Sequence, residues 1–515
     1  LSRSLPTRPC HASPSQAMGF VLNAALGVVA AVLLYLLARP RRGQNEPPLV
    51  GGHVPWLGAM VDFAMRPLGS VRAAWARHGE CFTLYVIGRK MTFMMGPEAH
   101  AVFFGAKDAE LSSREAYQMM VPVFGRGVVY DTTTENMYKQ LKLIKAGLKP
   151  QSLRAAVPLM NGVLGKVFTR YWGESGEHRN VLEDLNRVTM LTATKCLFGE
   201  EIHRMMWDAA TTFTRHYASL EHGINPLALF YPNLERYLPL PAFKRRDAAR
   251  VEIVRMFSAI IDARRAARAA EPSATPPDDV LQVFIDACDS GDGVLPDNDA
   301  IVGMLIALLF AGQHTSSITS TWTLLHLVHN PRVRDEVIAE ARRVLAAHNN
   351  ALDFDALRDM TLLDQCVRET LRMSPPLIHL MRVVKKPIRY KNFVVPPGHL
   401  ICCSPGVAMR GAPWKDGDTW NPHRFDNERE QPSPKFAYIP FGGGRHGCPG
   451  QVFGIQQVKT IIATLLLQYE FDACGAPMPP HDYTALVVGP TAPVRMRYRL
   501  RKDPLHPIGA GAAAS

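Results

Sequence analysis

The sequence predicts a mainly helical protein with a few short strands, folded as a single large domain. Stretches with the periodicity of apolar or amphipathic helices recur from residue 152 to residue 469, whereas strand-forming residues gather in only a few places. A length of 515 residues would suggest about three domains at roughly 150 residues each. No linker or internal repeat separates such units, so we expect one domain over residues 59–502.

The expected elements follow in chain order. Residues 81–96 are rich in strand formers on both sides of Gly88 and Arg89, which predicts a hairpin. The segment from Glu271 to Asp279 contains three prolines, which predicts a surface loop between helices. Helices are expected over residues 152–172, 181–198, 247–269, 279–288, 298–328, 332–346, 361–373 and 452–469, and short strands over 388–402 and 494–500.

An apolar segment precedes the domain. From Gly19 to Ala38 only Asn23 interrupts the run, and at about 1.5 Å per residue it is long enough to cross a bilayer core of about 30 Å. Arginines follow at positions 39, 41 and 42, and positive charge beside a span tends to stay in the cytosol. We expect a transmembrane anchor over residues 18–38 and a domain that faces the cytosol; a cleaved signal peptide and a buried helix are the alternatives.

The flanking segments carry weaker signals. Residues 1–17 precede Met18 and are interpreted as a translated leader or an artefact. Residues 39–58 are basic and proline-rich, which predicts a stiff connector. Residues 503–515 are rich in Gly, Ala and Pro and are predicted to be disordered.

The formal net charge of +12 fits nucleic acid, an anionic membrane surface or an acidic protein partner. No zinc-finger spacing or aromatic-interleaved basic stripe occurs, which argues against nucleic acid. The nine cysteines include no CxxC pair, so neither a zinc site nor a disulfide framework is indicated. A reduced compartment, a membrane and an acidic redox partner fit better.

One cysteine stands in a distinctive loop. Residues 441–450 read FGGGRHGCPG and precede an apolar helical run from Val452. A thiolate on such a loop can approach haem iron, because backbone amides stabilise the anion and glycines permit the close approach. A lone cysteine is more often a buried core residue, but the full FxxGxxxCxG spacing predicts that Cys448 binds iron.

Two further motifs lie upstream. Glu369 and Arg372 form an ExxR pair one helical turn apart, and Arg424 supplies a third charge. Residues 311–317 read AGQHTSS within a long helix, where small residues leave room for dioxygen and the hydroxyl of Thr315 can relay protons. Taken singly, the ion pair would be an ordinary surface feature and the small residues an ordinary helix crossing.

Together these motifs resemble the cytochrome P-450 superfamily. His314 stands where most members carry an acid, and in this respect the chain resembles the sterol 14α-demethylases, over almost all of Pro47 to Arg501. The resemblance implies the cytochrome P-450 fold, haem b with Cys448 as axial thiolate, and NADPH electrons supplied through NADPH-cytochrome P-450 reductase. It implies that His314 and Thr315 are catalytic, in proton delivery.

The residues from Tyr117 to Tyr130 resemble the family's YxxxxPVFGxGVxY segment, closest to the trypanosomatid form. By resemblance, the haem propionates are bound by Tyr117, Tyr130, Arg382 and His446, with a further base near Lys139 to Lys142 that cannot be aligned with certainty. The matching substrate-cavity positions are Met119, Met120, Phe124, Ala307, Phe310, Ala311, Leu486 and Val487, together with His379, where the family generally has an apolar residue.

The implied activity is removal of the 14α-methyl group of a sterol precursor, in three oxidations that use O2 and NADPH and release formate. The implied location is the endoplasmic reticulum membrane, as a single-pass protein of sterol biosynthesis.

The residue at position 119 is expected to influence sterol preference. In the family this position is phenylalanine in members that favour C4-monomethyl sterols and a smaller residue in members that accept C4-dimethyl sterols. Met119 is neither, so tolerance of both substrate types is expected. The alternatives are a haem-thiolate hydroxylase or isomerase of another lipid, and a non-catalytic haem-binding sensor.

Overall fold

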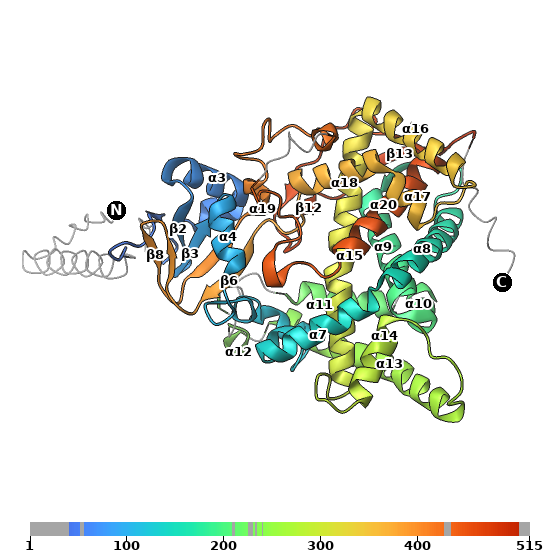
Figure 1. Cartoon of the computed structure of the whole chain (residues 1–515), viewed down its shortest axis with the longest axis horizontal. Coiled ribbons are helices and arrows are strands. Elements are labelled where there is room, and N and C mark those ends of the chain that lie inside the picture. Colours follow the sequence, from blue (N-terminus) through green and yellow to red (C-terminus); the bar gives the residue numbers. More distant parts are fainter. Residues whose placement is uncertain are drawn as a thin grey trace, which may run out of the picture.

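The computed structural model describes residues 41–51, 56–208, 212–224, 230–231, 234–238, 240–426 and 434–503. The predicted leader (1–17), the predicted anchor (18–38) and residues 504–515 of the predicted tail lie outside these residues. Within them, a sheet-rich part lies at the end where the described chain begins, and a larger helical part fills the rest (Figure 1).

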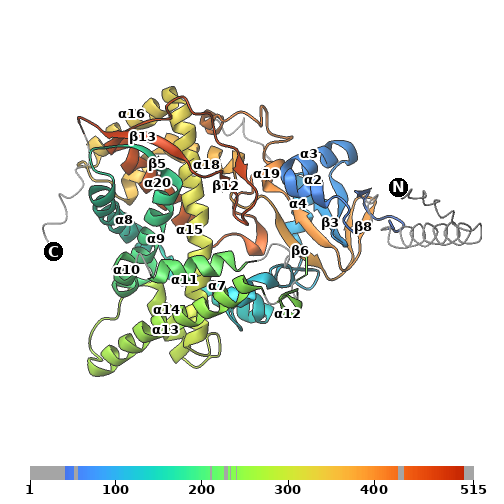
Figure 2. The ribbon, with the colours of Figure 1, turned by 180° about the vertical axis from the view of Figure 1, so that it is seen from behind.

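The helical part is built around α15 (Asn298–His329), which contacts α9 (Val181–Leu197), α13 (Pro241–Ala270) and α20 (Gln451–Gln468). Figures 1 and 2 show from both sides that α15 runs through this part of the molecule. It begins at Asp297, whose side chain accepts a hydrogen bond from the backbone of Ala300, as an N-cap does. Among the described helices, α15 alone is long and apolar enough to cross a membrane, but 61% of its most apolar window is buried inside the protein.

The main sheet has six strands in the order β1-β2-β3-β9-β6-β4. The expected hairpin is present as β2 (Cys81–Val86) and β3 (Arg89–Met94), and β3 pairs in parallel with β9 (Leu400–Cys403). Strand β6 (Leu380–Val384) runs antiparallel to β9 with Arg382 opposite Ile401. The short edge strands are β1 (Leu49–Val50) and β4 (Leu111–Ser112).

The predicted fold class and helices are confirmed, with boundaries displaced by a few residues. The largest displacement is at α13, which begins at Pro241 rather than at residue 247. The expected later strands are present as β7 (Ile388–Tyr390), β8 (Phe393–Val395), β9 and β13 (Arg495–Leu500). The other predicted helices are α8 (Pro150–Tyr171), α14 (Val280–Asp289), α16 (Pro331–Ala347) and α18 (Thr361–Met373).

Several elements near the site were not anticipated. Helix α7 (Thr134–Gly147) buries Gln140 completely, where the side chain bonds to the backbone of Gly127, Val129 and Val294. A polar residue in the core interrupts the apolar periodicity from which helices are predicted. Elsewhere in the fold, the elements that were not anticipated include α2 (Met60–Met65), α3 (Pro67–His78), α4 (Pro97–Gly105), α10 (Gly199–Asp208), α11 (Thr212–His222) and strand β6.

Candidate functional site

The cysteine loop has a fixed backbone. The amide of Cys448 donates to the carbonyl of Phe441 (3.0 Å), and the loop passes through a short 3-10 turn, η6 (Gly444–His446), before α20 begins at Gln451. Gly444 has a φ of +63°, and a Cβ there would lie 2.3 Å from the carbonyl oxygen of Phe104. Only glycine meets both conditions, so the local sequence determines how the loop presents Cys448.

The thiol of Cys448 is accessible. The surrounding protein raises the pKa of this thiol by desolvation, and the backbone N–H of Gly450 partly offsets that rise. A cationic or metal partner would favour the thiolate further.

The predicted ion network is present, and its central pair, Glu369 and Arg372, is completely buried. Both guanidinium contacts of Arg372 with Glu369 are short (2.7 and 2.8 Å), and Arg424 Nε donates to the same carboxylate at 2.9 Å. Arg372 also donates to the carbonyls of Met409 and Gly417, each at 2.7 Å. These buried charges are paired and hydrogen-bonded, so the network holds α18 against the segment that leads to the cysteine loop.

One face of α15 is open although the helix crosses the core. Ala311 is exposed, and a Cβ on Gly312 would meet nothing within 4 Å. In the first turn of α20, Gly454 approaches the hydroxyl of Ser316, with 3.8 Å between that oxygen and the position of a Cβ. The cysteine-bearing loop and helix therefore pack beside the small-residue segment of α15 that the sequence singled out.

The two predicted catalytic residues differ in their partners. Thr315 Oγ1 donates to the carbonyl of Ala311 at 2.6 Å, within its own helix. His314 Nε2 makes a close contact with the carboxylate of Glu221 on α11, and both side chains are about one quarter exposed (24% and 26%). Sequence reasoning did not identify Glu221, since 93 positions separate it from His314.

Three of the predicted propionate ligands come together at β6. The Tyr117 and Tyr130 rings lie 5.3 Å apart, and the Tyr117 hydroxyl accepts from the backbone N–H of Met381 (3.2 Å). Burial raises the pKa of Tyr130 to about 12, so its hydroxyl keeps its proton. Arg382, next in the chain after Met381, is 3% exposed and donates to the carbonyl of Phe103 at 2.7 Å.

Arg382 is the residue that most strongly indicates a binding site for an anionic group. Burial lowers the pKa of its guanidinium, and the nearby carboxylate of Asp108 offsets this only in part without forming an ion pair with Arg382 in the described part of the chain. An unpaired buried cation is costly. A propionate would supply the missing charge, with Tyr117 and Tyr130 as donors beside it.

The fourth predicted ligand, His446, belongs to a cluster that the sequence did not suggest. His446 Nε2 lies 2.7 Å from Asp108 Oδ1, and Tyr138 Oη donates to the other oxygen of this carboxylate at 2.7 Å. Burial would raise the pKa of the Asp108 carboxyl, but the Tyr138 hydrogen bond and the charge of His446 outweigh it and lower the pKa.

The further base expected near Lys139 to Lys142 is not found beside this cluster. Lys139 is exposed and pairs with Glu135 at 3.0 Å, and Lys142 is exposed as well. On α7 it is Tyr138 that reaches His446. Neither lysine is therefore placed at the predicted propionate site.

Most predicted cavity positions lie together in the largest apolar cluster. Phe124 and Phe310 meet edge to face with ring centres 6.0 Å apart, and Met119 and Met120 are buried in the same cluster. Ala307, Phe310 and Val487 are partly buried against it, whereas Leu486 is 44% exposed in the turn between β11 (His481–Asp482) and β12 (Gly489–Pro490). His379 lies apart from this cluster, on the sheet side.

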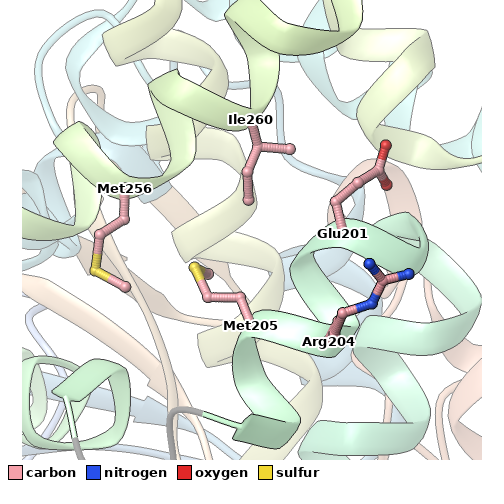
Figure 3. Close-up of a pocket in the computed structure, with 5 residues that line it drawn as sticks. All are labelled: Glu201, Arg204, Met205, Met256 and Ile260. Atoms are coloured by element: carbon pink, nitrogen blue, oxygen red, sulfur yellow. The ribbon is translucent and has the colours of Figure 1, made fainter.

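A separate open groove of about 440 Å³ lies between α10 and α13. Met205, Met256 and Ile260 face one another across it, with Glu201 and Arg204 along α10 (Figure 3). It contains none of the predicted site residues, so it is distinct from the site described above.

The residues present fit a haem held by one thiolate. Cys448 is an accessible thiol on a glycine-shaped loop, α15 presents an open small-residue face, and Arg382 is a buried cation without a carboxylate partner in the described part of the chain. These are the donor set and the close approach that haem ligation by cysteine requires.

Comparison with known proteins agrees with this assignment. The cytochrome P450 family model matches residues 47–496. Lanosterol 14-alpha demethylase of Mus musculus is 36% identical over 461 residues, which cover 89% of this chain and 88% of that protein. Obtusifoliol 14-alpha demethylase of Sorghum bicolor is 36% identical over 489 residues, which cover 93% and 96%. The solved structure of retinoic acid bound cyanobacterial CYP120A1 has a TM-score of 0.76 at 20% identity, covering 89% of this chain and all of that one, which shows a common fold.

Proposed function

The chain belongs to the cytochrome P450 family, and we propose that it removes the 14α-methyl group of a sterol precursor. The observation that carries the proposal is the likeness of nearly the whole chain to sterol 14-demethylases of animals and plants alike. The methyl group is oxidised three times, through the alcohol and the aldehyde, and leaves as formate. Each oxidation consumes one O2 and two electrons from NADPH.

The haem-binding residues have distinct tasks. Cys448 holds the iron of haem b, and Tyr117, Tyr130, Arg382 and His446 would hold its propionates. Haem with a thiolate ligand supplies the activation of dioxygen. The buried network of Glu369, Arg372 and Arg424 keeps the loop in place, because a fully paired set of buried charges resists rearrangement.

His314 and Thr315 deliver protons. The Thr315 hydroxyl lies one helical turn from Gly312 on α15, and by exchanging its bond to the Ala311 carbonyl it can donate to a reacting oxygen. His314 contacts Glu221, and both side chains are partly exposed, so this pair links the interior to solvent. Histidine suits such a role, because its two ring nitrogens can accept a proton on one side and donate one on the other.

The electrons come from NADPH through NADPH-cytochrome P-450 reductase, a separate protein. The formal charge of +12 favours association with an acidic partner.

A single-pass endoplasmic reticulum anchor over residues 18–38, with the domain in the cytosol, is part of the proposal. Exposed apolar side chains support a membrane near the start of the domain: Trp56 (55%), Val61 (55%) and Met65 (66%). Large apolar residues in such number on one part of a surface are typical of membrane contact.

The proposal is tested by reconstituting the haem-loaded protein with the reductase, NADPH and a panel of 14α-methyl sterols. Mass spectrometry should find the 14-demethylated product with its new 14,15 double bond, and formate in equal amount. A hydroxylated product that is not cleaved would indicate a hydroxylase, and a rearranged product formed without NADPH would indicate an isomerase. Sterol binding without any product would indicate a non-catalytic haem-binding sensor.

A further inference from the structure

Helices α11 and α15 meet through two side-chain contacts that lie one helical turn apart. Glu221 of α11 contacts His314 of α15. Four residues earlier on each helix, the ring of Tyr217 packs on the ring of Phe310 with 5.0 Å between their centres. Residues four apart lie on one face of a helix. Tyr217 is therefore on the face of α11 that carries Glu221, and it is the more deeply buried of the two, at 3% exposed against 26% for the Glu221 side chain.

The Tyr217 hydroxyl is buried and has no hydrogen-bond partner among the described residues. Burial raises the pKa of this hydroxyl well above its usual value, and the negative charge of Glu221 adds to the rise. The hydroxyl therefore keeps its proton and can donate a hydrogen bond. Glu221 is the charged group that lies near enough to act on it.

The ring that carries this hydroxyl is held in place by other rings. Phe213, one turn earlier on α11, stacks on the Tyr217 ring at 5.8 Å and on Phe257 of α13 at 5.6 Å. Together with Phe310 these rings form an aromatic cluster to which α11, α13 and α15 all contribute. Phenylalanine would serve such packing better than tyrosine, since a buried hydroxyl without a partner is destabilising. The hydroxyl of Tyr217 therefore needs a partner that it lacks in this arrangement.

The contact between Glu221 and His314 must open during each cycle of proton delivery. A proton that passes from the Glu221 carboxyl to His314 arrives at Nε2, and the imidazole then donates the proton of Nδ1 inward. To accept the next proton at Nε2, the imidazole must first lose the one that it now carries there, which requires it to turn away from Glu221. During that turn the Glu221 carboxylate has lost its partner, and a partly buried charge without a partner is unfavourable.

We propose that the Tyr217 hydroxyl is the second partner of the Glu221 carboxylate and holds it in place while His314 turns. The inference rests on the proposed function and adds a positioning residue to its proton path. Side chains on a helix lean toward its N-terminus, so a glutamate can reach a tyrosine four residues earlier. Glu221 thus alternates between His314 and Tyr217, and the hydroxyl donates its hydrogen bond without losing its proton.

The first test is Tyr217→Phe, which removes the hydroxyl and keeps the ring against Phe310. The haem-loaded full chain is assayed with reductase, NADPH and a 14α-methyl sterol. This variant should form about tenfold less product per NADPH, the effect of one hydrogen bond to a charged group. The missing electrons should appear as hydrogen peroxide. Sterol affinity, followed by the shift of the Soret band, should equal that of wild type, because the ring contact is unchanged.

Double variants separate a positioning role from a packing role. In the Glu221→Ala background, adding Tyr217→Phe should have no further effect, because the hydroxyl acts only through the carboxylate. Thr189→Val is the control for the loss of a buried hydroxyl. Thr189 Oγ1, on α9, is also buried without a hydrogen-bond partner in the described part of the chain. This variant should couple NADPH to product as wild type does.

The alternation also has a spectroscopic signature that needs no turnover. In His314→Ala the carboxylate has lost its first partner, so Glu221 should remain bonded to Tyr217. With ring-labelled tyrosine in the protein, the infrared C–O stretch of one tyrosine should shift in His314→Ala relative to wild type. The shift should be absent when Tyr217→Phe is added.

The outcomes separate the two proposals. If wild type demethylates no sterol, the proposed function fails, and the infrared signature still tests the contact between Tyr217 and Glu221. If Tyr217→Phe couples NADPH to product as wild type does, or if its effect multiplies with that of Glu221→Ala, the role of Tyr217 is wrong. A tyrosine band that does not shift in His314→Ala would overturn it as well.

Discussion

His314 and Glu221 form the contact whose removal is most informative at the scale of single residues. Because the pair links α15 to solvent, replacing either partner should slow proton delivery. We expect His314→Ala and Glu221→Gln each to lower product formed per NADPH by roughly 10²-fold, within the range of general acid–base catalysis. Electrons should then appear as hydrogen peroxide, while the Soret band stays that of wild type.

Glu252→Gln provides the control for the charge change, since Glu252 forms an exposed pair with Arg255 on α13. It should couple NADPH to product as wild type does. Wild-type product yield in both the His314 and the Glu221 variants would show that protons reach the site by another route.

Met119 is the residue on which sterol preference is expected to depend. It is 3% exposed and lies in the cluster that contains Phe124 and Phe310. Its flexible thioether can retract from an additional methyl group, whereas a phenylalanine ring cannot. Met119→Phe should shift turnover toward C4-monomethyl over C4-dimethyl substrates, by a factor of about 10–200 for one methyl group. Unchanged relative rates for the two substrates would place selectivity elsewhere.

The sequence predicts those site residues whose function depends on local spacing. Cys448, Glu369 and Arg372 belong to short motifs, so their roles follow from neighbours in the chain. Asp108 and Glu221 could not be found in this way, because they meet His446 and His314 only after folding, across 338 and 93 positions. The expected closeness to the trypanosomatid form stays a prediction.

At the scale of elements, α4, α7 and the cysteine loop meet in the Asp108 cluster. Asp108 lies just beyond α4, Tyr138 on α7 and His446 in η6. Asp108→Asn should weaken the hold on His446 and increase haem loss to an acceptor apoprotein by roughly tenfold, because a hydrogen bond to a charged group contributes about 1.5–3 kcal/mol. Tyr138→Phe removes one hydrogen bond and should have a smaller effect.

Lys139→Met is the control on the same helix, since Lys139 is exposed and pairs with Glu135. Haem should leave this variant at the wild-type rate. Equal rates in the Asp108 and Lys139 variants would mean that the cluster does not contribute to haem retention.

Elements were predictable where one physical signal dominates. Helix α15 is apolar over most of its length and has an N-cap, so its limits were found to within one residue. Strand β6, which carries Arg382, was missed because a buried arginine interrupts a five-residue apolar run, and the strand is defined by its pairing with β9. A short strand that is defined by its pairing with another strand has only a weak signal in its own sequence.

At the scale of the whole molecule, the start of the described chain is part of the fold. Glu46 pairs with Lys90 at 2.7 Å, and the carbonyls of Asn45 and Pro48 accept from Val394 and Thr83, each at 2.8 Å. Strand β1 then adds to the sheet beside β2. Residues 45–50, within the connector expected over 39–58, therefore hold the sheet edge.

These contacts determine where the chain can be shortened. A chain beginning at Arg41 keeps all of them, so it should fold, bind haem and stay in the supernatant at high salt, if residues 18–38 serve only as an anchor. A chain beginning at Gly51 lacks the Glu46 ion pair, both backbone hydrogen bonds and β1. At about 0.5–1.5 kcal/mol for each hydrogen bond, it should unfold several degrees lower. Thermal unfolding followed at the Soret band compares the two chains with the full-length protein in detergent.

Failure of the chain from Arg41 to hold haem, while the full-length protein does, would show that the apolar segment belongs to the folded domain. Equal melting of the two shortened chains would show instead that β1 and its contacts add nothing to the sheet.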